Sequence, residues 1–193
     1  MMLLGSTLLN AAVMSIQTGG ELARTIAPII DSANLKVLAY ELEGPLLESN
    51  ATTLIRLADV RELSDIGLIV DSSDEFVRPE DVIALNEVYS RHFRLIGMNV
   101  TDERRQKLGK VVDFTVETGS YFIQQLTVRR PLFKSLNDTE LLVHRSQIIE
   151  INDRAIVVHS EAKVPEPELH EVIGSYVNPF RKPESTTESS QRD

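Results

Sequence analysis

The chain contains an internal repeat, and this constrains its fold more than any other feature. The stretch Leu22–Ser49 aligns without a gap with Leu108–Ser135, at an offset of 86 residues, and matched apolar positions recur along it. After a two-residue insertion the offset becomes 88, so that Leu54 aligns with Leu142 and later positions follow. Matched apolar positions over this length with two small gaps predict that one unit of about seventy residues occurs twice.

Each copy has the pattern of short strands separated by turns. In the second copy the apolar runs 148–151 and 155–158 flank Asn152-Asp153, and these two residues tolerate the positive φ that a tight hairpin requires. The first copy has a similar pattern around Ser64-Asp65. Several short strands at this spacing, without a long helical pattern, predict a mainly β protein made of two small closed or nearly closed barrels.

The remaining segments define the expected domain organisation. Residues 78–89 carry Pro79, acidic residues in the first turn and apolar residues at helical spacing, which predicts a helix of about three turns that packs the two barrels together. We therefore expect a first domain at 1–77, a helical linker at 78–92 and a second domain at 93–162. A C-terminal extension would occupy 163–193, and from about residue 182 it is too polar to order itself.

Composition excludes several classes of protein. The chain has no Cys, so disulfides, thiolate zinc sites and cysteine nucleophiles are ruled out. The net charge of −9 disfavours general nucleic-acid binding, although it is unevenly spread. Residues 1–77 carry 4 basic and 11 acidic side chains, whereas residues 78–163 carry 13 and 12. A local basic patch in the second half is therefore compatible with an acidic chain.

The apolar N-terminal segment, residues 1–17, resembles a signal peptide only superficially. It has no basic residue before Arg24, and polar residues interrupt its apolar run. No stretch approaches the ~20 apolar residues of a membrane helix. We interpret the segment as a folded strand and expect a cytoplasmic protein.

No group of residues predicts catalysis or metal binding. The four histidines, at positions 92, 144, 159 and 170, lack the spacing of metal ligands, and acidic pairs fall in turns or at a helix start. Nucleophile, Walker and dinucleotide glycine motifs are absent from the sequence. We expect no catalytic residue, no metal and no cofactor, and hence not an enzyme.

The second copy resembles the PRC-barrel family. The family pattern of an apolar pair and Gly, a Val, then Leu-Gly-Lys-Val occurs as Leu95-Ile96-Gly97, Val100 and Leu108-Gly109-Lys110-Val111. The closing apolar strand, polar turn and Val run occur between Ser146 and Val158. The first copy matches less well, with Asn10 at the first Gly position.

The resemblance implies two tandem six-stranded barrels joined by a short helix, as in uncharacterised bacterial proteins with two such domains. It covers about three quarters of the chain. The family includes the H subunit of the photosynthetic reaction centre and the C-terminal domain of a ribosome-maturation factor. Because these barrels take part in complexes and carry no activity of their own, the resemblance implies an adaptor that binds a protein partner.

The candidate partner-binding residues are cations of the second copy. A Pro-Leu segment carries Glu43 and Glu48 in the first copy and cations at the matching positions in the second, where more cations lie in a nearby turn. The proposed set is Arg104, Arg105, Lys107, Lys110, Arg129, Arg130 and Lys134. These residues would bind an acidic protein surface, or RNA in an RNA- or ribosome-associated assembly factor. Alternatively the loops are solvated, or the oppositely charged loops pair between the barrels or across a homodimer.

Overall fold

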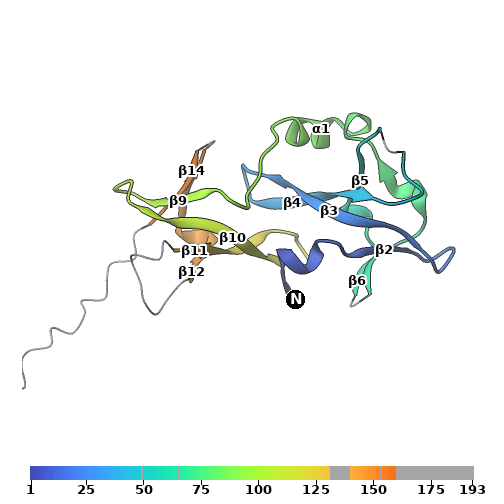
Figure 1. Cartoon of the computed structure of the whole chain (residues 1–193), viewed down its shortest axis with the longest axis horizontal. Helices are drawn as coiled ribbons and strands as arrows, with labels where there is room; N and C mark the ends of the chain where they lie inside the picture. Colours follow the sequence, from blue (N-terminus) through green and yellow to red (C-terminus); the bar gives the residue numbers. More distant parts are fainter. Residues whose placement is uncertain (49, 65, 131–139, 153, 160–193) are drawn as a thin grey trace, which may run out of the picture. The chain divides into compact units, whose positions relative to one another are not determined.

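The chain folds mainly into β-strands (Figure 1). The computed structural model describes residues 1–48, 50–64, 66–130, 140–152 and 154–159. Within them the strands form two sheets, and Met1–Ser160 is one compact unit. The expectations for Lys134, for His170 and for the extension 163–193 lie outside the described residues. No described helix is long and apolar enough to cross a membrane.

The first sheet has the strand order β6-β7-β2-β3-β4-β5-β8. Its strands are β2 (Ala12–Ser15), β3 (Glu21–Asp31), β4 (Lys36–Glu43), β5 (Thr53–Arg56), β6 (Glu62–Ser64), β7 (Gly67–Val70) and β8 (Phe76–Val77). Three short 3-10 turns accompany them, η2 (Leu57–Asp59), η3 (Ser73–Glu75) and η4 (Pro79–Asp81). The helix α1 (Ile83–Tyr89) follows.

The second sheet has the order β12-β11-β10-β9-β14-β13. Its strands are β9 (Asn99–Asp102), β10 (Lys107–Glu117), β11 (Ile123–Arg129), β12 (Glu140–His144), β13 (Ile148–Ile151) and β14 (Ala155–Val158), with the 3-10 turn η5 (Arg145–Gln147) before β13. The N-terminal strand β1 (Met2–Leu4), followed by the 3-10 turn η1 (Gly5–Leu8), pairs with β10 of this sheet. The expected strand near the N-terminus therefore exists, but it extends the second sheet.

The two sheets have the same order once β1 and β8 are set aside. In both, the first strand lies parallel to the last one, as β2 to β7 and β9 to β14, and the other neighbours are antiparallel. Six of the eight described residues with positive φ also fall into equivalent pairs. They are Gly19 and Arg105, and Leu35 and Tyr121, at an offset of 86, and Asn10 and Gly97 at an offset of 87.

Neither sheet closes on itself among the described strands, so the expected two barrels, closed or nearly closed, are not confirmed. The hydrogen-bonded order ends at β12 and β13 in one sheet and at β6 and β8 in the other. The 3-10 turn η2 separates β5 from β6, and η5 separates β12 from β13. Neither of these two pairs of consecutive strands is hydrogen-bonded. The strands alternate between the two faces, and the inward residues form one core of aliphatic side chains that spans both sheets.

The two sheets contact each other through equivalent residues. The backbone N–H of Val37 donates to the carbonyl of Tyr121 at 2.9 Å, and that of Ile123 donates to the carbonyl of Leu35 at 2.8 Å. Lys36 and Phe122 form the bridge between these bonds. Because each residue is related to its equivalent by the offset of 86, the contact is reciprocal, as in an isologous dimer interface.

The helix α1 is shorter than expected and packs on the first sheet. It has seven residues, preceded by η4, and its buried residue Leu85 contacts a small cluster with Ala39 and Leu54. The prediction that this helix packs the two units together is therefore wrong. The short helix buries only one residue, and the contact between the sheets is instead made by β-strand ends.

Candidate partner-binding surface

The turn between β9 and β10 is held by a buried carboxylate. Asp102 is buried, and its Oδ1 accepts hydrogen bonds from the backbone N–H of Arg104 at 2.9 Å and of Gln106 at 2.7 Å. The backbone of Arg105 adopts a left-handed conformation with φ of 62°. Satisfying these N–H groups with a side chain orders the turn, so both arginines project from a defined backbone into solvent.

The next cations lie on the strands that continue from this turn. Lys107 and Lys110 are exposed on β10, and Arg129 is exposed at the end of β11, where it is the register partner of Lys110. Gly109 allows the strands to approach here, because a Cβ at this position would lie 2.2 Å from the carbonyl oxygen of Arg129. Like charges directly opposite each other on neighbouring strands are destabilising. This sheet therefore holds a repulsive pair at its outer face.

The first sheet carries the opposite charge at two of these three positions and a cation at the third. Lys107, Lys110 and Arg129 correspond to Glu21, Arg24 and Glu43 at the offset of 86. Arg24 forms an ion pair with Glu21 at 2.7 Å and has Glu43 as its register partner on β4. Within the described residues, none of the three second-sheet cations forms an ion pair. The first sheet thus has a cation with acidic neighbours at these positions, whereas the second sheet has three cations without an ion-pair partner among the described residues.

Two acidic residues and one amide border the cations. Glu103 pairs with His159, and Glu140 on β12 is the register partner of Arg129 on its other side. Asn99 on β9 is the partner of Lys110, and its buried Oδ1 has no hydrogen-bond partner in the described part of the chain. The row across the outer face from β12 to β9 therefore runs from an acid through two cations to an amide.

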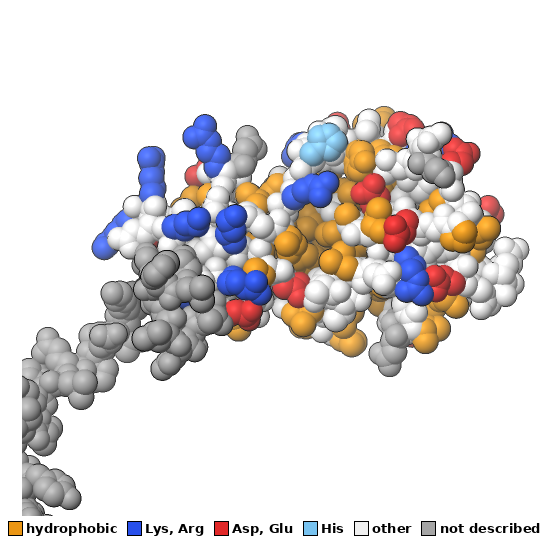
Figure 2. All heavy atoms as spheres, in the orientation of Figure 1, with side chains coloured by type: hydrophobic (Ala, Val, Ile, Leu, Met, Phe, Trp, Pro, Cys, Tyr) orange, Lys and Arg blue, Asp and Glu red, His pale blue; other side chains and the backbone are white. Residues whose placement is uncertain are grey.

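The structure brings together six of the seven predicted residues. Arg104, Arg105, Lys107, Lys110, Arg129 and Arg130 lie on one hairpin and the adjoining strand end, and Lys134 lies outside the described residues. Figure 2 shows Lys and Arg side chains gathered over the end of the molecule that carries β9, β10 and β14. Pairing with the acidic loop of the first unit is not seen in the described ranges, where Glu48 pairs with Arg78 instead. Partner binding by these cations remains a prediction.

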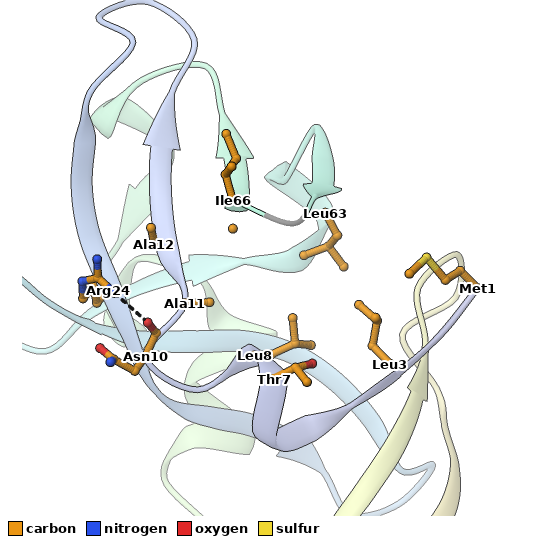
Figure 3. A pocket seen from close by; sticks show the side chains of 11 residues that line it. Met1, Leu3, Thr7, Leu8, Asn10, Ala11, Ala12, Arg24, Leu63 and Ile66 are labelled. Atoms are coloured by element: carbon orange, nitrogen blue, oxygen red, sulfur yellow. Dashed lines mark hydrogen bonds between the residues drawn. The ribbon is translucent and has the colours of Figure 1, made fainter.

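A separate cavity of about 500 Å³ lies beside the N-terminal segment (Figure 3). Its walls combine apolar residues, among them Leu3, Leu8 and Leu63, with polar groups of the residues described next. The guanidinium of Arg24 at its edge donates to the carbonyl of Asn10 and also bonds Glu21. The hydroxyl of Thr7 donates to a backbone carbonyl at 2.7 Å. Because the protein itself engages these polar groups, the cavity offers no converging reactive constellation.

Metal-ligand clusters are also absent from the residues that the structure describes. What the fold and the surface define is a mainly β protein with an exposed cationic hairpin on its second sheet. Residues 87–164 of the chain match the family model of the PRC-barrel domain. The match includes β9 to β14 and all of the predicted cations, and it leaves the first sheet outside. A search of the curated proteins found no match to this chain.

Sequence reasoning found the cations but not their arrangement. The opposition of Lys110 and Arg129 across two strands requires the register between β10 and β11. The repeat did carry a signal for it, because Arg24 and Glu43 at the equivalent positions have opposite charges. Comparing charges at matched positions along both copies would have singled out the row before the structure was known.

Proposed function

We propose that the protein is a non-enzymatic adaptor made of two PRC-barrel-type units, of which the second binds an acidic surface of a protein partner. The family match at residues 87–164 supports this assignment for the second unit. The common strand order supports extending it to the first unit, which the match does not cover. The observation that carries the proposal is the replacement of the ion-paired group around Arg24 by unpaired Lys107, Lys110 and Arg129.

The physical reason is the energy of the free protein. Cations that oppose one another across strands cost stability unless something compensates them. An acidic partner supplies this compensation on binding, and complementary charge also accelerates association and selects the orientation. The first sheet does not need such a partner, because its own Glu21 neutralises Arg24.

A protein partner fits this surface better than RNA does. Proteins that bind single-stranded nucleic acid combine cations with exposed aromatic side chains on which bases stack. The six described cations are accompanied by Gln106, Asn99 and two acidic residues. The one Phe, Tyr or Trp residue in the strands β9 to β12, Phe114, is buried and offers no stacking surface. Glu103 and Glu140 would also repel a continuous polyanion.

Affinity capture with charge-reversed variants tests the proposal. The triple variant Lys107→Glu, Lys110→Glu, Arg129→Glu should lose a protein that the wild type recovers from native lysate. A matched control reverses three exposed cations elsewhere, Arg91, Arg94 and Arg154, and should retain it.

Three outcomes would contradict the adaptor role at this surface. They are recovery of no protein above background, recovery that the patch variant leaves unchanged, and equal loss in the control variant. RNase-sensitive recovery of RNA that weakens steeply with salt would identify nucleic acid as the ligand instead.

A further inference from the structure

The first sheet shows how the edge of this scaffold is covered by a short strand. The strand β8 pairs antiparallel with β5, with Leu54 opposite Val77 and Ile55 opposite Phe76. Leu54 is 0% exposed as a result, because Val77 and the helix residue Leu85 pack against it. The strand β5 is thereby hydrogen-bonded on its outer side, and its apolar residue Leu54 is covered.

The second sheet lacks this cover among its described residues. The strand β12 is the equivalent of β5, and it ends the sheet with β11 as its only strand partner in the described ranges. Leu142, the equivalent of Leu54, is 55% exposed. An edge strand with unpaired backbone groups and an exposed apolar residue is a template for another strand.

We propose that β12 is a docking edge for an extended segment of the acidic protein partner, which adds a strand beside β12 and places an apolar side chain against Leu142. This inference rests on the proposed function, because it names how the same partner engages the second sheet. Strand addition derives affinity from main-chain hydrogen bonds and specificity from the side chains that alternate along the added strand.

The composition of the outer face favours a strand over a helix as the occupant. In the first sheet the helix α1 rests on a face that includes Leu38 and Ala39. The equivalent residues of the second sheet are Gln124 and Gln125, which are polar and provide no apolar surface for a helix to pack against. Leu142, the equivalent of Leu54, is apolar in both sheets, and it lies on the edge strand β12.

Charge gives the occupant its acidic character. Leu142 and Glu140 alternate with inward residues on β12, so both share the outer face with Arg129, the register partner of Glu140. Lys110 continues the same row on β10. A strand added at β12 lies about 5 Å from β12 and about 10 Å from β11. Glu140 faces it directly, so its acidic residues must lie beyond Glu140 to contact Arg129, and Lys110, one strand further, contributes longer-range attraction.

The chain itself provides a defined probe for this edge. The segment Ser72–Asp81 contains β8 and carries four acidic side chains and one basic one around Phe76 and Val77. We would titrate the capped synthetic peptide of this sequence into the isotope-labelled full chain and follow backbone amide shifts. Saturable shifts should centre on residues 140–144, and Leu142→Asp should weaken binding at least about tenfold. The matched control Leu46→Asp, at an exposed leucine of the first unit, should leave binding unchanged.

The variants separate this inference from the proposed function. Shifts confined to the hairpin 102–110 that survive Leu142→Asp would overturn strand addition and leave the acidic partner standing. Loss of lysate capture in Leu142→Asp as well as in the cation triple variant would support both.

Two further results would overturn the inference. One is the absence of shifts at millimolar peptide. The other is strong protection from hydrogen exchange, in the free chain, of the backbone N–H groups of β12 that point away from β11. Such protection would mean that the edge is already occupied. Dependence of that protection on protein concentration would identify a second copy as the occupant, and independence would identify a segment of the same chain.

Discussion

The two sheets place the same strands in the same order and surround them with different charges. In the first sheet Arg24, Arg56 and Arg61 each pair with an acidic residue of that sheet's own segment. In the second sheet, within the described ranges, no Lys or Arg side chain forms an ion pair. Strand order depends on inward apolar residues and on turns, which the copies share, whereas an exposed charge contributes little to folding. The charges of the outer surface could therefore diverge while the strand order was kept.

The interiors of the two sheets also differ, and Tyr40 is one such position. Tyr40 is 0% exposed and its hydroxyl has no hydrogen-bond partner in the described part of the chain, whereas its equivalent Leu126 is wholly apolar. Burial, with a further contribution from the charge of Asp113, raises the pKa of Tyr40. At this position the first sheet thus carries a polar cost that the second sheet does not.

The largest difference between equivalent positions should appear at the close approach of two strands. Gly109→Ala should lower the free energy of unfolding by about 3 kcal/mol, because the new Cβ would overlap the carbonyl of Arg129 and the strands must separate. Ala23→Gly, the reverse change at the equivalent position of the first sheet, should cost less than about 1 kcal/mol. Urea unfolding measures both. Equal free energies of unfolding for the wild type and Gly109→Ala would show that β10 and β11 tolerate a wider spacing.

The turns between the first two strands of each sheet should rank next. Asp102→Ala removes two hydrogen bonds to backbone N–H groups and should cost about 2 kcal/mol. Ser15→Ala removes the hydroxyl that accepts from Thr18 and donates to the carbonyl of Asp71, and should cost about 1 kcal/mol. Thermal or urea unfolding checks the ranking, and a larger loss for Ser15→Ala would contradict it.

Tyr40→Phe should stabilise the protein by about 1 kcal/mol, because it removes a buried hydroxyl without a partner. The folded state raises the pKa of Tyr40 above its unfolded value of about 10. The contribution of Tyr40 to stability should therefore be fully present below that value and be lost as the pH rises through the folded pKa. Unfolding measured from pH 8 to 12 should show a weaker alkaline loss in Tyr40→Phe, and parallel curves would contradict this origin.

The smallest effects should come from the cross-strand charge pairs. Lys110→Glu places an acid opposite Arg129 and should raise the free energy of unfolding by about 0.5 kcal/mol. Glu43→Lys places a cation opposite Arg24 and should lower it by a similar amount. Both changes should shrink in high salt, because exposed charges are screened. Opposite signs for the two variants are the essential result.

Much of the fold could be predicted from the repeat, because apolar alternation and turn residues are local. The offsets of 86 and 88 locate the equivalent strands, and Asn10 and Gly97 mark equivalent turns with positive φ. The length and seating of the helix after Pro79 were less predictable. A segment of that composition suits a longer helix, and only its packing on Ala39 and Leu54 shows where it lies.

By itself the sequence determined that the protein is mainly β, that its two halves share a pattern, and that the second half carries the cluster of cations. The tertiary structure alone decided that Lys110 faces Arg129, that β1 joins the second sheet and that Leu142 lies exposed on an edge. Alternation and turns act between neighbours in the chain, so the sequence displays them directly. The strand register, the pairing of β1 with β10 and the exposure of the edge depend on residues far apart in the chain, which only folding brings into contact.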